Sequence, residues 1–179
     1  TRPLPLRFGR EVCGDADAAE SREWLVTNGI GGFASGTLSG IRTRRYHAPL
    51  IAALAPPVGR TVMASDVHAS LRVDGDEIPL HASRWRGDVV DPRGFEHLEA
   101  FWLDGRTPVW RYRLGAVCLE QSVTMVMGRN VTVLRYRLVR SPSRGGPGSL
   151  CAVAGPAGAG GTSRHDAPSS AAGTVRPTG

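Results

Sequence analysis

The run at 109–114 reads Val109-Trp110-Arg111-Tyr112-Arg113-Leu114, and from Trp110 onward its apolar and charged side chains alternate. Successive side chains of a strand point to opposite faces, so one face of this run would carry Trp110, Tyr112 and Leu114. The opposite face would carry Val109 and the two arginines. This pattern is typical of a half-buried antiparallel strand.

The same period of two recurs in the two segments that follow. One face of the first carries Leu119, Gln121, Val123, Met125 and Met127, and one face of the second carries Leu134, Tyr136 and Leu138. Turn residues separate such runs: Asp74-Gly75 and Asp104-Gly105 predict two hairpins, and Gly128-Arg129-Asn130 predicts a third connection. A helical period is present only at 15–24, as a short turn. The sequence therefore predicts an all-β, antiparallel β-sandwich rather than an α/β fold.

Composition changes abruptly at Ser141. From there to Gly179, 27 of the 39 residues are Gly, Ala, Ser or Pro and none is aromatic. Such a segment would bury too little apolar surface to offset the entropy lost on ordering. We therefore predict a β-sandwich domain over 8–140 and a low-complexity, disordered tail over 141–179. GC-rich coding DNA that is read in the wrong frame encodes many Gly, Ala, Pro, Ser and Arg residues. We therefore hypothesise that the tail is the product of a frameshift.

Charge and cysteine content disfavour several classes of partner. The net charge is +6, but every cation is an arginine and the arginines are scattered from Arg2 to Arg176, so we expect no nucleic-acid partner. Three distant cysteines and dispersed histidines fit no zinc site or disulfide framework. No window resembles a signal peptide or a membrane span. We expect no metal, no cofactor, no membrane contact and a cytoplasmic location.

Gly29, Gly31 and Ala34 match the G-x-G-x-x-G/A spacing of a dinucleotide-binding loop. That loop needs a helix directly after the glycines and an acidic residue about 20 positions later. Neither is predicted, because Ser35-Gly36-Thr37 is poor helix material and no Asp or Glu occurs between Glu23 and Asp66. The alternative is that these glycines permit tight turns or bulges between strands.

These glycines belong to a sequence motif that is much longer than the three-glycine pattern. It runs Arg22-Glu23-Trp24-Leu25-Val26-Thr27-Asn28-Gly29-Ile30-Gly31-Gly32-Phe33-Ala34-Ser35-Gly36-Thr37 and continues with Thr43-Arg44-Arg45-Tyr46-His47. Further matching stretches are Pro56-Pro57-Val58-Gly59-Arg60, Asp91-Pro92-Arg93-Gly94-Phe95, Thr107-Pro108-Val109-Trp110 and Val133-Leu134-Arg135-Tyr136-Arg137-Leu138. Together they resemble the N-terminal domain of bacterial and archaeal glycogen debranching enzymes, over roughly residues 8–140.

The chain departs from that family at Ala48-Pro49-Leu50, where Gly-Leu-Leu is usual. Proline fixes φ and removes an amide donor, so we expect the strand after His47 to be an edge strand or to be distorted.

The resemblance implies that this sandwich precedes a catalytic (α/α)6 barrel, which hydrolyses α-1,6 branch linkages in glycogen or limit dextrin. The carboxylates of that reaction belong to the barrel, so we predict no catalytic residue here and interpret Asp91, Glu96 and Glu99 as surface residues. More strands follow residue 138 in the family, so the sandwich is expected to be incomplete. The implied partners are α-glucan and the catalytic barrel, which we expect to lie outside this chain.

Five residues of the family motif are candidates for contact with glucan or with the catalytic domain: Trp24, Asn28, Arg45, Tyr46 and His47. Aromatic faces suit the apolar faces of pyranose rings, and planar polar groups suit the hydroxyls. The alternative is that Trp24 and Tyr46 belong to the core while Arg45 and His47 brace an interdomain surface. A rival function is a stand-alone carbohydrate-binding or protein-interaction sandwich without an enzymatic parent.

Overall fold

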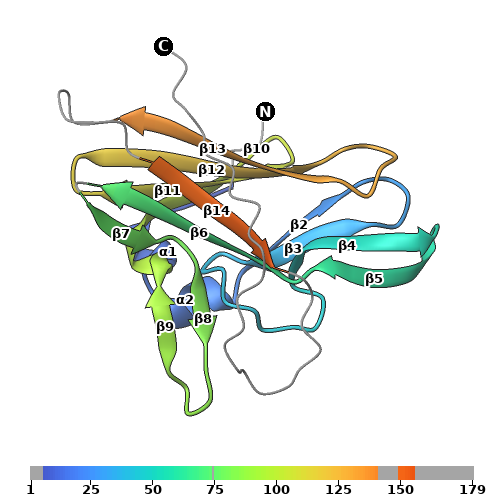
Figure 1. Cartoon of the computed structure of the whole chain (residues 1–179), viewed down its shortest axis with the longest axis horizontal. Coiled ribbons are helices and arrows are strands. Elements are labelled where there is room, and N and C mark those ends of the chain that lie inside the picture. The colour runs from blue at the N-terminus through green and yellow to red at the C-terminus, as the bar shows by residue number, and fades with distance from the viewer. Residues whose placement is uncertain (1–5, 74, 141–148, 156–179) are drawn as a thin grey trace.

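The computed structural model describes residues 6–73, 75–140 and 149–155, and antiparallel strands dominate it (Figure 1). The first half contains β1 (Arg7–Phe8), α1 (Arg10–Cys13), α2 (Ala16–Glu20), β2 (Glu23–Thr27), β3 (Phe33–Thr37), β4 (Ala48–Ala55), β5 (Val58–Ala64), β6 (Asp66–Val73) and β7 (Asp76–Pro79). The second contains β8 (Ala82–Arg84), β9 (Val90–Arg93), the 3₁₀ turn η1 (Gly94–His97), β10 (Leu98–Asp104), β11 (Thr107–Leu114), β12 (Val117–Met125), β13 (Thr132–Arg140) and β14 (Ser149–Gly155). The all-β prediction is confirmed.

The largest sheet has five strands in the order β1-β10-β11-β12-β13. The other sheets have the orders β2-β3-β4-β5, β14-β6-β7 and β8-β9. In Figure 1 the strands β11 to β13 run across the top, β2 to β5 lie at the lower right, and α1, α2, β8 and β9 lie at the lower left. One core contains buried side chains from the five-stranded sheet, from β2, β3 and β6, and from both helices, so these elements pack as the layers of a single sandwich.

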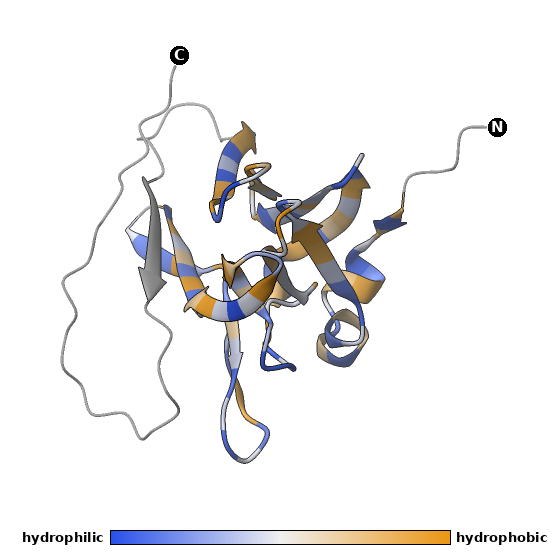
Figure 2. Cartoon of the chain, turned by 90° about the vertical axis from the view of Figure 1, so that its right-hand side faces the viewer, coloured by the Kyte–Doolittle hydropathy of each residue, from blue (hydrophilic) through white to orange (hydrophobic). Residues whose placement is uncertain are grey.

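The alternation predicted at 109–114 is present in β11. Trp110, Tyr112 and Leu114 are buried in the core, whereas Arg113 is exposed. Trp110 also donates a hydrogen bond from Nε1 to the carbonyl of Leu38 at 3.1 Å, which satisfies its one polar atom. Figure 2 shows changes between blue and orange along several strands of the domain.

The three predicted connections join neighbouring antiparallel strands. Gly75 (φ 97°) lies between β6 and β7, Gly105 (φ 61°) between β10 and β11, and Gly128 (φ 74°) between β12 and β13. Positive φ favours glycine at all three. Met127, which the sequence pattern placed on one strand face with Leu119 and Val123, lies outside the strand, because β12 ends at Met125, and Met127 is 72% exposed.

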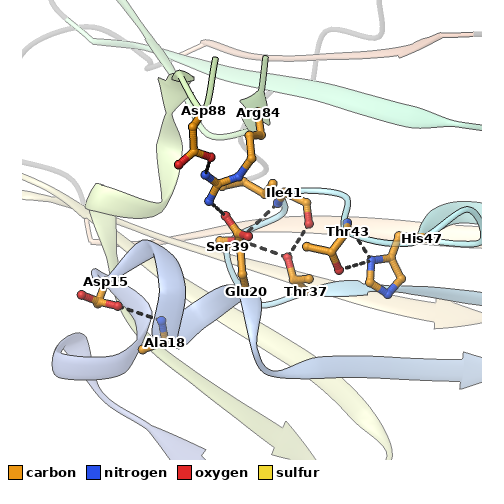
Figure 3. A network of polar contacts seen from close by, with 10 residues as sticks. All are labelled: Asp15, Ala18, Glu20, Thr37, Ser39, Ile41, Thr43, His47, Arg84 and Asp88. Carbon is orange, nitrogen blue, oxygen red and sulfur yellow. Dashed lines mark hydrogen bonds and ion pairs between the residues drawn. The ribbon is translucent and has the colours of Figure 1, made fainter. Parts of the chain in front are cut away.

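The predicted helical turn at 15–24 is confirmed for a shorter segment, α2. Asp15 caps it, with its carboxylate accepting a hydrogen bond from the amide of Ala18 at 2.7 Å (Figure 3).

The glycine-rich segment connects two strands and is followed by β3, not by a helix. A dinucleotide loop is therefore excluded, and the interpretation as a turn is confirmed. Gly29 and Gly31 have φ of 79° and 93°. A Cβ atom on Gly31 would also lie 2.6 Å from the carbonyl oxygen of Pro57, so the β2–β3 and β4–β5 connections touch at a point that only glycine fits.

Pro49 distorts its strand, as expected, but β4 is not an edge. It lies between β3 and β5. In the register with β3, Ser35 pairs with Ala48 and Phe33 with Ile51, so β4 carries one extra residue around Pro49. This bulge accommodates the missing amide donor inside the sheet.

The expectation of a disordered tail does not hold for Ser149–Gly155. This segment forms β14, which pairs antiparallel with β6 from Ser149↔Arg72 to Gly155↔Asp66. The run Leu150-Cys151-Ala152-Val153-Ala154 is apolar and lacks proline and glycine, and pairing with a strand edge requires only backbone groups. The remainder of the predicted tail lies outside the described residues.

Candidate functional site

A surface groove of about 530 Å³ lies over the outer face of β2 and β3 and the segment that precedes β4. Its lining residues are Glu23, Trp24, Leu25, Phe33, Ser35, Arg44, Arg45, Tyr46 and His47. Four of the five candidate residues are therefore brought together at one place. Asn28 is not among them.

Tyr46 lines the groove and is 40% exposed. Its ring meets Phe33 edge to face, with centroids 6.5 Å apart, and the guanidinium of Arg45 lies 5.6 Å from its centroid. Ser35 donates a hydrogen bond from Oγ to the Tyr46 carbonyl at 2.8 Å, which fixes the backbone at this point. Tyr46 therefore presents a positioned aromatic surface with a cation beside it.

His47 lies beneath the groove, with 4% of its side chain exposed. Its Nδ1 is 3.3 Å from both the amide and the hydroxyl of Thr43 (Figure 3). An amide nitrogen can only donate, so Nδ1 accepts and the proton of the neutral ring is on Nε2, which lies 3.4 Å from Oε1 of Glu23. Burial lowers the pKa of His47, against the opposing effect of Glu23. The neutral ring therefore fastens the 43–47 segment to β2.

Glu23 receives a second partner from the same segment. Arg44 Nε lies 2.6 Å from the carboxylate oxygen that faces His47. The carboxylate is thus held between a cation and an imidazole, and it fixes the wall of the groove rather than standing free.

Trp24 contributes to the groove but belongs mainly to the core. Its ring meets Trp110 nearly at right angles, with centroids 5.2 Å apart, and Nε1 donates to the carbonyl of Thr37 at 3.1 Å. The core interpretation is thus supported for Trp24, whereas Tyr46 is on the surface.

Asn28 is fully buried and serves the fold. Its Nδ2 donates to the carbonyl of Arg129 at 3.0 Å and to Oδ1 of Asn130 at 2.9 Å. Its Oδ1 accepts from the amides of Ile30 at 3.1 Å and Gly32 at 2.9 Å. These four bonds use the full hydrogen-bonding capacity of the amide, so no atom of it is open to a ligand in this structure.

The connection between β3 and the groove segment is held by buried polar side chains (Figure 3). Thr37 Oγ1 donates to the carbonyl of Ile41 at 2.7 Å and lies 3.0 Å from Ser39 Oγ, which accepts from the amide of Ile41 at 3.2 Å. On the far side of this connection, Arg84 of β8 binds Glu20 of α2 and Asp88. The loop that delivers Tyr46 is therefore fixed from within.

The family model described as "Glycogen debranching enzyme N terminal" matches residues 22–150. This chain belongs to that family. The matched range begins at 22 and ends at 150, where the resemblance predicted 8–140. Comparisons with curated proteins and with solved structures found no match.

Sequence reasoning missed five groove residues of this glycogen debranching enzyme N-terminal domain: Glu23, Leu25, Phe33, Ser35 and Arg44. Leu25 is 59% exposed and pairs with Ser35, which lines the same groove. The period of two in β2 places Glu23 and Leu25 on one face, so it could have indicated that Leu25 lines the groove. Nothing in the sequence indicated that this face is the outer one.

Other chemistry is sparse in the part of the domain that the structure describes. No cluster of three or more His, Cys, Asp or Glu side chains there could hold a metal ion, and none of its helices is long and apolar enough to cross a membrane. Two of the three surface carboxylates named from the sequence are engaged with arginines: Glu99 with Arg113 at 2.6 Å and Glu96 with Arg93 at 3.1 Å.

Proposed function

We propose that this chain is the non-catalytic N-terminal domain of a glycogen debranching enzyme and that its groove binds α-glucan. The parent activity would be hydrolysis of α-1,6 branch linkages in glycogen or limit dextrin, as a step of glycogen catabolism. A separate (α/α)6 domain would carry out that reaction. The observation that carries the proposal is the exposed Tyr46 ring, held between Phe33 and Arg45 in a groove of about 530 Å³.

The groove has the chemistry that a glucan needs. A pyranose ring offers an apolar face, which an exposed tyrosine ring can cover, and a rim of hydroxyls, which guanidinium and carboxylate groups can bind. Arg45 supplies a guanidinium next to the Tyr46 ring, whereas the Glu23 carboxylate is paired with Arg44 and His47 and holds the wall of the groove. The volume also lies within the usual range for small-molecule sites, about 300–1,000 Å³.

The residues that line the groove include a single carboxylate, and this favours a role in binding over a role in hydrolysis. Glycoside hydrolysis normally takes two carboxyl groups roughly 5–10 Å apart, one of which is free to donate a proton. Among the residues lining the groove, Glu23 alone carries a carboxylate, and that group is paired with Arg44 and His47. This supports assigning the reaction to the partner domain.

The proposed location is the cytoplasm, where glycogen is stored and thiols stay reduced. The two cysteines whose side chains the structure describes, Cys13 and Cys118, are both free and buried.

The test is titration calorimetry of the chain with limit dextrin, for the native protein and for Tyr46→Ala. Loss of the stacking ring should weaken binding about tenfold, which corresponds to about 1.4 kcal/mol. Trp85→Ala is the matched control, because Trp85 is a 58% exposed aromatic residue in the β8–β9 connection, away from the groove. Equal affinity of the native and Tyr46→Ala proteins would refute the glucan site.

A further inference from the structure

A second pocket, of about 430 Å³, lies between the segment that precedes β4 and strand β8. All but one of the residues that line it are polar or charged: Arg42, Thr43, Arg44, Asp66, Ala82, Ser83 and Arg84. Arg44 lines both this arginine pocket and the groove. No aromatic residue lines the arginine pocket, so it lacks the stacking surface that suits a sugar ring.

Two of the three arginines can donate to a bound anion. Arg42 is exposed and forms no ion pair with any residue that the structure describes. Arg44 lies 2.6 Å from Glu23 through Nε, but its side chain remains 70% exposed, so its terminal nitrogens can meet a second anion. Guanidinium groups bind the oxygens of phosphate-like anions well, because their N–H groups form a planar fork.

Strand β8 provides the other polar groups of the pocket. Arg84 is already bound to Glu20 and to Asp88, so it contributes a fixed position more than an available charge (Figure 3). Ser83 adds a hydroxyl, which can donate to an anion oxygen.

Asp66 is the one carboxylate among the residues that line the pocket, and it restricts which anion can bind. Its Oδ1 accepts from the amide of Val67 at 2.8 Å, and its Oδ2 lies 3.1 Å from Nε2 of His68. Each oxygen has a second lone pair, so the carboxylate can still accept a hydrogen bond from a ligand. Asp66 would repel an anion without a proton, whereas an anion that carries an O–H group can donate to it.

Inorganic phosphate has both properties. Its ionised oxygens can accept from the arginines, and near neutral pH it keeps at least one proton that it can donate to Asp66. Sulfate carries no proton at this pH. A phosphate monoester, whose second pKa is about 6, has mostly lost its last proton. The combination of arginines with one carboxylate therefore favours inorganic phosphate over the other two anions.

We propose that the arginine pocket binds inorganic phosphate. Arg42 and Arg44 donate to its ionised oxygens, and Asp66 accepts a hydrogen bond from its O–H group. The proposal does not depend on glucan binding, so a groove that fails to bind limit dextrin would leave it intact.

The test is titration calorimetry of the full chain with sodium phosphate at about pH 7.5 and constant ionic strength. The full chain is used because β14 ends with Gly155 opposite Asp66, and the residues after Gly155 must be present. We expect saturable binding of phosphate, and binding of sulfate and of glucose 6-phosphate that is weaker by about tenfold or more. No saturable binding of phosphate, or equal affinity for phosphate and sulfate, would overturn the proposal. Tighter binding of glucose 6-phosphate would identify a monoester as the ligand and would also overturn it.

Two variants localise the anion. Arg42→Gln should weaken phosphate binding by about tenfold, whereas Arg106→Gln should not. Arg106 is exposed in the β10–β11 turn, and its loss changes the net charge equally. Equal effects of these two variants would reduce the interaction to net charge and contradict the proposal.

Asp66→Asn tests the selectivity. The neutral amide can donate to sulfate and no longer repels it, so the preference for phosphate over sulfate should fall to about twofold or less. An unchanged preference in this variant would show that Asp66 does not contact the anion and would refute the assigned geometry.

Discussion

Asn28 joins two connections that are 101 residues apart in the sequence, since its amide bonds both the β2–β3 loop and the carbonyl of Arg129. The backbone carbonyl of Asn28 also accepts from the amide of Gly128 at 2.7 Å. A residue type that suits sugar binding is thus used to close the fold. Its side chain reaches no solvent, so its effect on any ligand would pass through the position of the loop.

Replacing Asn28 by Ala should lower the free energy of unfolding by about 2–4 kcal/mol, because several buried partners lose their hydrogen bonds at once. Urea denaturation followed by tryptophan fluorescence measures this. Thr124→Ala is the control: Thr124 is exposed on β12, so its loss should cost no more than about 0.5 kcal/mol. A cost below about 1 kcal/mol for Asn28→Ala would show that the bonds contribute little.

Stability should fall as the pH drops below about 6.5. Burial lowers the pKa of His47 and of His81, which stacks on His68 with ring centroids 4.2 Å apart. Each group takes up a proton more readily in the unfolded chain, so its stabilising contribution is full above the unfolded pKa and is lost as the pH falls towards the folded one.

Thermal melts from pH 8 to pH 5 should therefore show a falling Tm. The fall should be smaller in His47→Gln, which has one group fewer to titrate. A Tm that is constant over this range, or that rises towards acid pH, would contradict the lowered pKa values of His47 and His81 in the folded protein.

The β2–β3 connection contains a glycine, Gly31, at which both backbone conformation and packing disfavour a side chain. Gly31 combines a positive φ with contact against the Pro57 carbonyl, whereas Gly40 has a similar φ of 81° and no atom within 4 Å of the point where a Cβ would lie. The two glycines therefore separate backbone strain from steric overlap.

Gly31→Ala should cost at least about 2 kcal/mol of stability, because strain and overlap add. Gly40→Ala should cost about 1 kcal/mol from strain alone. Chemical denaturation of both variants measures the two losses of stability. Equal losses would mean that the β2–β3 and β4–β5 connections do not touch in solution.

Periodicity in the sequence predicted the strands whose two faces differ. Trp110, Tyr112 and Leu114 are buried because alternation of side chains is a local property, and the glycine turns follow from local conformation as well. The strand at Ser149–Gly155 was missed, since its pairing with β6 depends on a distant partner and its small side chains give no amphipathic signal.

The candidate site was predicted in part for the same reason. The family motif contains Arg45, Tyr46 and His47, and these three residues line one groove because they are neighbours in sequence. It could not show that Asn28 points inward or that Leu25 and Phe33 face out, because these depend on how the sheets pack.

Across the whole domain, one core supports two neighbouring sites. The groove lies over β2 and β3, whereas the arginine pocket lies between the segment before β4 and strand β8. The first has an aromatic ring and paired polar groups, and the second has three arginines and one aspartate. The one carboxylate that lines the groove, that of Glu23, is paired with Arg44 and His47.

Native electrophoresis of the full chain through a gel containing glycogen, with glucose release from limit dextrin assayed in parallel, tests the non-catalytic glucan-binding role most directly. We expect glycogen to retard the chain in proportion to its concentration, and we expect no glucose. Unchanged mobility at high glycogen would contradict the binding role, and release of glucose by the purified chain would contradict its non-catalytic character.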